Sequence, residues 1–93
     1  MKIKILPGFR EKFSNQLEYI AKDKPQAARM FRKDIIDEIH NIITMPFRHR
    51  QSVHFNDSNI REFSFKGYLV IYRIKEEKDE IEVFGFIKYT QKP

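Results

Sequence analysis

Residues 59–65, NIREFSF, show the regular alternation of apolar and polar side chains that is typical of a half-buried β-strand. Phe63 and Phe65 fall on one face of such a strand, and Glu62 and Ser64 fall on the other. We therefore expect the two phenylalanines to point into the core of the protein.

A second strand is predicted after a tight turn at Lys66 and Gly67. Residues 68–74, YLVIYRI, are apolar on both faces as far as Arg73, which favours a central strand covered on both sides over a strand at the sheet edge. Arg61 has the same parity as the inward-facing phenylalanines of the first strand. Because an unpaired buried charge is very costly, we expect its guanidinium to be partnered or to lie at the rim of the core.

The N-terminal half of the chain predicts a short strand and two helices. Lysine and isoleucine alternate in residues 2–6, a pattern that predicts the strand. A first helix is predicted from a stripe of apolar residues, namely Phe9, Phe13, Leu17 and Ile20. A second helix begins near Pro25 and ends by Met45 ahead of Pro46, and its apolar stripe consists of Ala28, Phe31, Ile35, Ile39 and Ile42. The break at residues 23–25 is short, which predicts an antiparallel helix hairpin.

The rest of the chain predicts one sizeable loop and one more strand. Residues 47–58 are polar, rich in arginine and end in turn-forming residues, and residues 75–80 form a charged turn. Alternation along the last strand, residues 81–89, places two sets of apolar side chains on opposite faces, with Ile81, Val83 and Ile87 on one and Phe84 and Phe86 on the other. We expect Gly85 to mark a β-bulge or a close approach of another backbone.

The predicted elements follow the order β-α-α-β-β-β within one domain that covers residues 1–93. Three consecutive strands joined by tight turns pair largely antiparallel. The expected fold class is therefore α+β, a two-layer domain in which an antiparallel helix hairpin packs on a mainly antiparallel four-stranded sheet.

Composition removes several classes of function. The chain has no cysteine, which excludes a disulfide framework and a thiolate nucleophile. His49 and His54 lie in a flexible loop without the three or four ligands of a zinc site, so we expect no metal and no cofactor. The serines and the isolated glycines match neither a serine-hydrolase elbow nor a phosphate-binding loop. No stretch approaches the roughly 18 apolar residues of a membrane span, so we expect a cytoplasmic protein with no membrane partner.

The net charge of +5 is unevenly distributed. Residues 1–33 carry nine lysines and arginines against three acids, and a second basic excess lies between Arg48 and Arg73. Such a surface favours a polyanion or an acidic protein as partner. The residues that could bind phosphate or assist RNA cleavage are Arg48, Arg50, Arg61, Lys66, Arg73, Lys88 and Tyr89. Composition alone favours the alternative of an ordinary solvated cationic surface, with Tyr89 capping the core.

Several motifs occur in an order and spacing that a known family shares. They are a Pro-x-Ala-Ala start to the second helix, a proline ending it, an arginine-rich loop, an Ile-Arg-Glu strand, a Gly-Tyr turn leading into an apolar strand that ends in Tyr-Arg, and a closing apolar strand. In these features, over nearly its whole length, the chain resembles the RelE/ParE superfamily of toxins from bacterial type II toxin–antitoxin systems. The resemblance implies a growth inhibitor, and the family has the element order derived above.

The family that the chain resembles has two branches with different activities. The RelE-like branch cleaves mRNA on the ribosome without a metal, and here it would use Arg61, Lys66, Lys88 and Tyr89. Leu69 stands where that branch has an arginine, and Thr90 and Gln91 stand where acid–base residues are expected, which argues against efficient cleavage.

The Ile60-Arg61-Glu62 pattern is more similar to the ParE branch, whose members poison DNA gyrase and do not cleave RNA. A ParE-like toxin that is not an enzyme is therefore the leading interpretation. The alternatives are a RelE-like ribosome-dependent endoribonuclease and an inactive relative that only binds the antitoxin.

The resemblance also implies partners. Gyrase, or the ribosome and its mRNA, would be the target, contacted by Arg48, Arg50, Arg61 and Arg73. A small cognate antitoxin with an acidic C-terminal segment would neutralise the toxin by folding over Phe9, Phe13, Leu17, Arg29 and Arg32. Larger toxin–antitoxin assemblies are a further possibility that the family allows.

Overall fold

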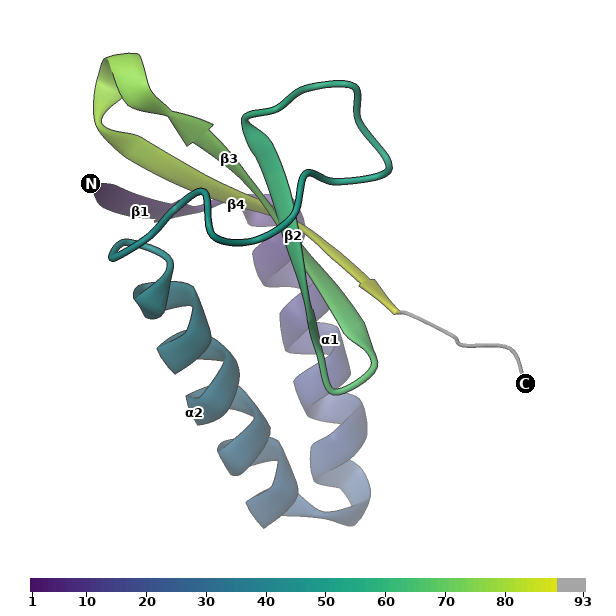
Figure 1. Ribbon diagram of the computed structural model, residues 1–93. Helices are drawn as coiled ribbons and strands as arrows, with labels where there is room; N and C mark the ends of the chain where they lie inside the picture. Colours follow the sequence, from purple (N-terminus) through teal and green to yellow (C-terminus); the bar gives the residue numbers. More distant parts are fainter. Residues whose placement is uncertain (89–93) are drawn as a thin grey trace.

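The computed structural model describes residues 1–88, and Figure 1 shows its elements. In chain order they are β1 (Lys2–Ile5), α1 (Pro7–Asp23), α2 (Pro25–Asn41), β2 (Ile60–Phe65), β3 (Tyr68–Lys75), the short 3-10 helix η1 (Glu76–Lys78) and β4 (Glu80–Lys88). The α+β class and the β-α-α-β-β-β order predicted from the sequence are confirmed.

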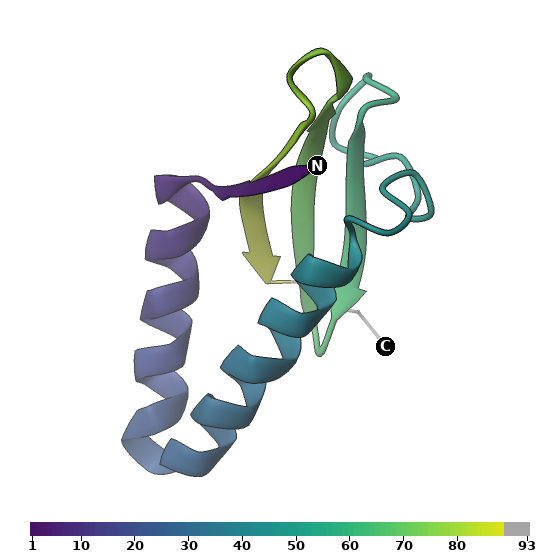
Figure 2. The same cartoon turned by 90° about the vertical axis from the view of Figure 1, so that its left-hand side faces the viewer.

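The four strands form one mixed sheet in the order β1-β4-β3-β2. β2, β3 and β4 pair antiparallel, whereas β1 pairs parallel to β4. The apolar β3 is therefore a central strand, as its sequence predicts, and β1 and β2 form the two edges. The helix hairpin covers one face of the sheet, and its tip extends beyond the turn between β2 and β3 (Figures 1 and 2).

The helices begin and end close to the predicted positions because prolines mark their limits. Pro7 and Pro25 occupy first-turn positions, where a missing N–H is tolerated. α2 ends at Asn41, earlier than the predicted limit at Met45, and residues 42–44 continue as hydrogen-bonded turns.

The core lies between the helix hairpin and the sheet, and aromatic rings form a large part of it. Phe86 of β4 is central to this cluster: its ring stacks on Tyr68 at 4.8 Å and meets Phe9 and Phe13 of α1 edge-on at 5.5 and 5.6 Å. Phe31 of α2 meets Tyr68 edge-on at 5.6 Å. These contacts hold the helix hairpin on the sheet and thereby fix where the chain leaves α2 and enters the loop before β2.

A bulge in β4 corrects one prediction about side-chain direction. Ile71 pairs with Gly85 and Tyr72 pairs with Val83, so one additional residue lies on β4 at this point. The bulge expected at Gly85 is thus present. Beyond it the alternation is reversed: Phe86 is buried in the core, and Ile87, which was expected on the face of Val83, is 38% exposed.

Candidate functional site

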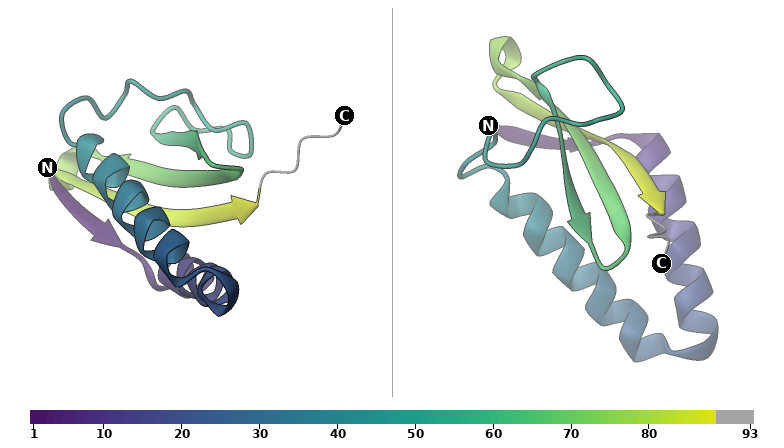
Figure 3. Two further views of the ribbon diagram at one scale, coloured as in Figure 1. Left: turned by 90° about the horizontal axis from the view of Figure 1, so that it is seen from below. Right: turned by 45° about the vertical axis from the view of Figure 1, so that its right-hand side comes forward.

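The loop between α2 and β2 wraps around the free edge of β2. Figure 3 (left) shows the helices on one side of the sheet and most of this loop on the other. The Ser52 N–H donates to the Ile60 carbonyl at 2.8 Å, and the Glu62 N–H donates to the Arg50 carbonyl at 3.1 Å. Gln51 forms an antiparallel bridge with Arg61. Residues 50–52 therefore behave as a short additional strand that covers half of this edge.

A buried carboxylate holds the loop in place. The side chain of Glu62 is 0% exposed, and its Oε2 accepts hydrogen bonds from Arg50 Nε at 3.0 Å and Arg50 Nη2 at 2.7 Å. Its Oε1 accepts a hydrogen bond from the Ser52 hydroxyl at 2.7 Å. We call Arg50, Ser52 and Glu62 the loop clamp. The sequence places Glu62 on the outer face of its strand but gives no sign that the loop folds back to bury it.

Arg61 holds the same loop from the helix side of the sheet. Its Nε donates to the Ser58 carbonyl at 2.8 Å, and its Nη1 donates to the carbonyls of His49 at 3.0 Å and Phe47 at 3.4 Å. Its guanidinium also lies 5.0 Å from the centre of the Phe47 ring, a cation–π contact. The side chain is half-buried and partnered by carbonyls, which agrees with the position at the rim expected from its parity.

Two rings of the core anchor the start of the loop. The His49 ring packs on Phe63 at 5.0 Å and meets Tyr72 edge-on at 6.2 Å. The Tyr72 hydroxyl donates to the Pro46 carbonyl at 2.7 Å, and burial raises the pKa of Tyr72 to about 12. Burial, together with the nearby charge of Arg48, lowers the pKa of His49 below its ordinary value. His49 therefore acts as a neutral packing residue at neutral pH.

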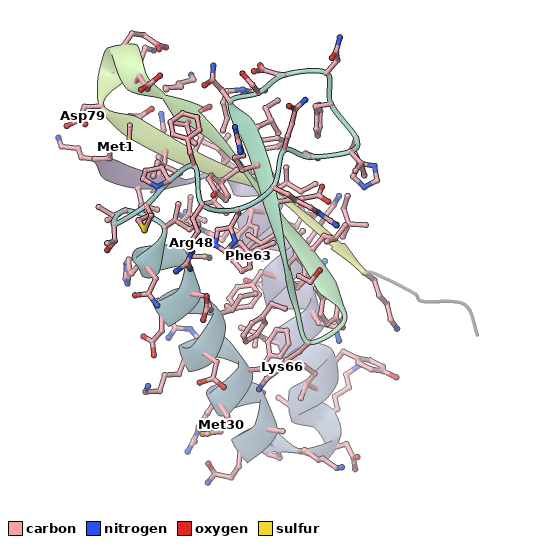
Figure 4. The ribbon with its side chains drawn as sticks, in the orientation of Figure 1. Met1, Met30, Arg48, Phe63, Lys66 and Asp79 are labelled. Atoms are coloured by element: carbon pink, nitrogen blue, oxygen red, sulfur yellow. The ribbon has the colours of Figure 1, made fainter. Side chains whose placement is uncertain are left out.

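Of the four arginines predicted to bind the target, three are held by other groups of the chain. Arg73 pairs with Glu82 at 3.3 Å and lies 5.0 Å from the centre of the Phe84 ring. Arg50 and Arg61 hold the loop as described. Arg48 is exposed and, within residues 1–88, makes no hydrogen bond or ion pair through its side chain. Figure 4 shows it beside the C-terminal end of α2.

The residues predicted for RNA cleavage do not gather in the part of the chain that the structure describes. Lys66 lies in the turn after β2 and pairs with Asp34 of α2 at 3.2 Å. Lys88 is opposite Tyr68 at one end of β3, whereas Arg61 is opposite Tyr72, four residues further along. This separation corresponds to about 13 Å along a strand. Tyr89 lies outside the described residues.

The residues predicted to contact an antitoxin line hollows along the helix hairpin. One groove is lined by Phe9, Phe13, Leu17 and Arg32 together with Ile5, Arg10, Ser14 and Ile36. A second, shallower hollow near the hairpin tip includes Leu17, Arg29 and Arg32. Phe9 and Phe13 are 1% and 7% exposed and belong mainly to the core, so they form the floor of the groove. The arginines are exposed and flank it.

Neither a metal centre nor a membrane span is found in residues 1–88. No group of three or more His, Asp or Glu side chains in this range is placed to hold a metal ion. The same range includes no helix that combines the length and the apolar character needed to cross a membrane.

Comparisons with known proteins identify the family of the chain. The family model described as the ParE toxin of the type II toxin–antitoxin system parDE matches residues 3–92. A solved structure described as the chromosomal ParDE TA system from P. aeruginosa has the same fold, with a TM-score of 0.78, 12% identity and coverage of 97% of each chain. No curated protein sequence matches the chain. Since the family model spans almost all of its 93 residues, the chain belongs to the ParE toxins of type II toxin–antitoxin systems.

Proposed function

We propose that this toxin stops bacterial growth by binding DNA gyrase, and that it does so as a binding inhibitor in the cytoplasm, where gyrase acts. The observation that carries the proposal is the separation of the candidate cleavage residues: Lys88 lies opposite Tyr68 at one end of β3, and Arg61 lies opposite Tyr72, four residues further along. Metal-free RNA cleavage needs a base, an acid and a cation within hydrogen-bond reach of one phosphate. Leu69, where the RNA-cleaving branch has an arginine, is 4% exposed and brings no charge to the surface.

The groove along the helix hairpin supports binding of a cognate antitoxin. Its floor is apolar, and Arg10 and Arg32 lie along it. An amphipathic segment that presents apolar side chains to the floor and carboxylates to the arginines would fit this arrangement. The fold match to a protein described as part of a ParDE system is consistent with such a partner. The antitoxin's acidic C-terminal segment is the part that we propose occupies the groove.

The gyrase proposal is tested with purified protein and relaxed plasmid. We expect micromolar toxin to block supercoiling by gyrase, and induction of the toxin in bacteria to change plasmid topology before messenger RNA is degraded. Arg32→Ala is the matched control, because it lies on the helix groove: it should keep the inhibition and weaken binding of the small protein encoded beside the toxin. Cleaved ribosome-bound message with unchanged topology would contradict the proposal.

A further inference from the structure

Three large apolar side chains are exposed at alternate positions just after α2. Ile43 is 40% exposed, Met45 is 57% exposed and Phe47 is 42% exposed. Arg48 follows directly and is exposed as well. We call these four residues the post-helix platform. Large apolar side chains that gather at the surface instead of in a core mark interaction sites, and Met, Phe and Arg are enriched there.

Hydrogen bonds order the backbone of the platform although it contains no helix or strand. The N–H groups of Ile43 and Thr44 donate to the carbonyls of His40 and Asn41 at 3.3 and 3.2 Å, and the Arg48 N–H donates to the Met45 carbonyl at 3.1 Å. The Tyr72 hydroxyl fixes the Pro46 carbonyl, as described above. A partner that binds here does not have to order the segment first, which lowers the entropic cost of association.

Around the platform the charges are mainly positive. Residues 39–56 contain no aspartate or glutamate, and they include Arg48 and Arg50. Arg61 adds a guanidinium over the Phe47 ring. Two acids line a shallow groove together with Arg48, namely Glu38 of α2 and Glu62 of β2, and Glu62 is buried and paired with Arg50. A partner with carboxylates around an apolar centre would therefore be complementary to this surface, because it supplies anions to arginines and a dry pocket to the apolar side chains.

We propose that the post-helix platform is the surface with which this toxin engages its protein target, at an apolar pocket rimmed by carboxylates. The inference rests on the proposed function and adds to it the contact surface. It also assigns separate roles to the arginines: Arg48 contacts the target, while Arg50 and Arg61 shape the loop that follows. The helix groove stays free for the antitoxin.

The test compares two charge-introducing variants with matched controls. Met45→Glu and Arg48→Glu alter the platform. Met30→Glu on α2 and Lys12→Glu at an exposed position of α1 introduce the same kinds of change elsewhere, and Met30 has the same 57% exposure as Met45. Figure 4 shows that Met30 lies far from Arg48 along α2. Circular dichroism and thermal unfolding first establish that all four variants fold, and inhibition of purified gyrase is then titrated.

The expected result is at least a tenfold rise in the half-inhibitory concentration for the two platform variants and less than about a twofold change for the controls. If the wild type inhibits gyrase and the platform variants inhibit it equally well, the inference is overturned and the gyrase proposal stands. If the wild type does not inhibit gyrase, the gyrase proposal fails and growth arrest becomes the readout. If only the platform variants then lose growth arrest, the result would support the platform as the contact surface for a different protein target. Any other pattern, including a wild type that does not arrest growth, would overturn the inference.

Discussion

Replacing Arg50 by methionine tests whether the loop clamp stabilises the protein. The Glu62 side chain is 0% exposed, so removal of its cationic partner leaves a buried carboxylate with the Ser52 hydroxyl as its remaining side-chain donor. Breaking a buried ion pair in this way costs about 3–5 kcal/mol. Because the Arg50 side chain is 59% exposed, water can reach that side of the carboxylate, and we expect a smaller loss of about 2–3 kcal/mol.

The assay is urea unfolding followed by circular dichroism, supported by thermal unfolding. In a domain of this size the expected loss corresponds to a decrease in Tm on the order of 10–20 °C. The double variant Arg50→Met/Glu62→Met removes the buried charge as well, so its free energy of unfolding should return to within about 1 kcal/mol of wild type. Arg48→Met, which alters an arginine without a side-chain partner in residues 1–88, should change it by less than about 0.5 kcal/mol.

Two results would refute the reasoning about the clamp. If Arg50→Met were as stable as Arg48→Met, the buried carboxylate would not depend on its guanidinium partner. If the double variant were less stable than either single variant, the loss would come from packing and not from an unpaired charge.

Three further predictions follow from the packing and the pKa shifts. Gly85→Ala should lower the free energy of unfolding by about 1–3 kcal/mol because the added Cβ would lie 2.8 Å from Ile71 Cβ. In Gly8→Ala the added Cβ would meet its nearest atom at 3.9 Å, so the free energy of unfolding should stay unchanged or rise by up to about 1 kcal/mol. Urea unfolding measures both changes. Because the pKa of His49 is lowered in the fold, the folded state binds fewer protons than the unfolded state. The stability of the protein should therefore fall as the pH drops through 6.5, the ordinary pKa of histidine. His49→Phe should flatten this part of a Tm-versus-pH curve. Because the pKa of Tyr72 is raised from 10.0 to about 12, stability should fall as the pH rises between these values. Tyr72→Phe should make that slope shallower in a denaturant series at alkaline pH, and the slope that is left comes from Tyr68, whose pKa is also raised by burial.

The fold was predictable because its elements carry local signals. Alternation defines β2, apolar stripes define α1 and α2, and prolines mark the helix starts. The Lys66-Gly67 turn is equally local, since both residues have positive φ, 46° and 87°, which suits a two-residue hairpin. Short connections then leave few arrangements for the pieces. The pattern failed beyond Gly85, because one additional residue in β4 reverses every later side chain and alternation by itself does not show on which residue a bulge falls.

The candidate site was predictable only as a set of charged residue types. By itself the sequence determined that a basic loop precedes an Ile-Arg-Glu strand, and it determined the family that this pattern resembles. Only the tertiary structure decided that Arg50 pairs with a buried Glu62 twelve residues away, that Arg61 binds loop carbonyls, and that Arg48 stays exposed. The physical reason is that an arginine has the same charge and the same donors wherever it lies. Its role is fixed by the acceptors that distant segments bring to it, and those distances exist only in the folded chain.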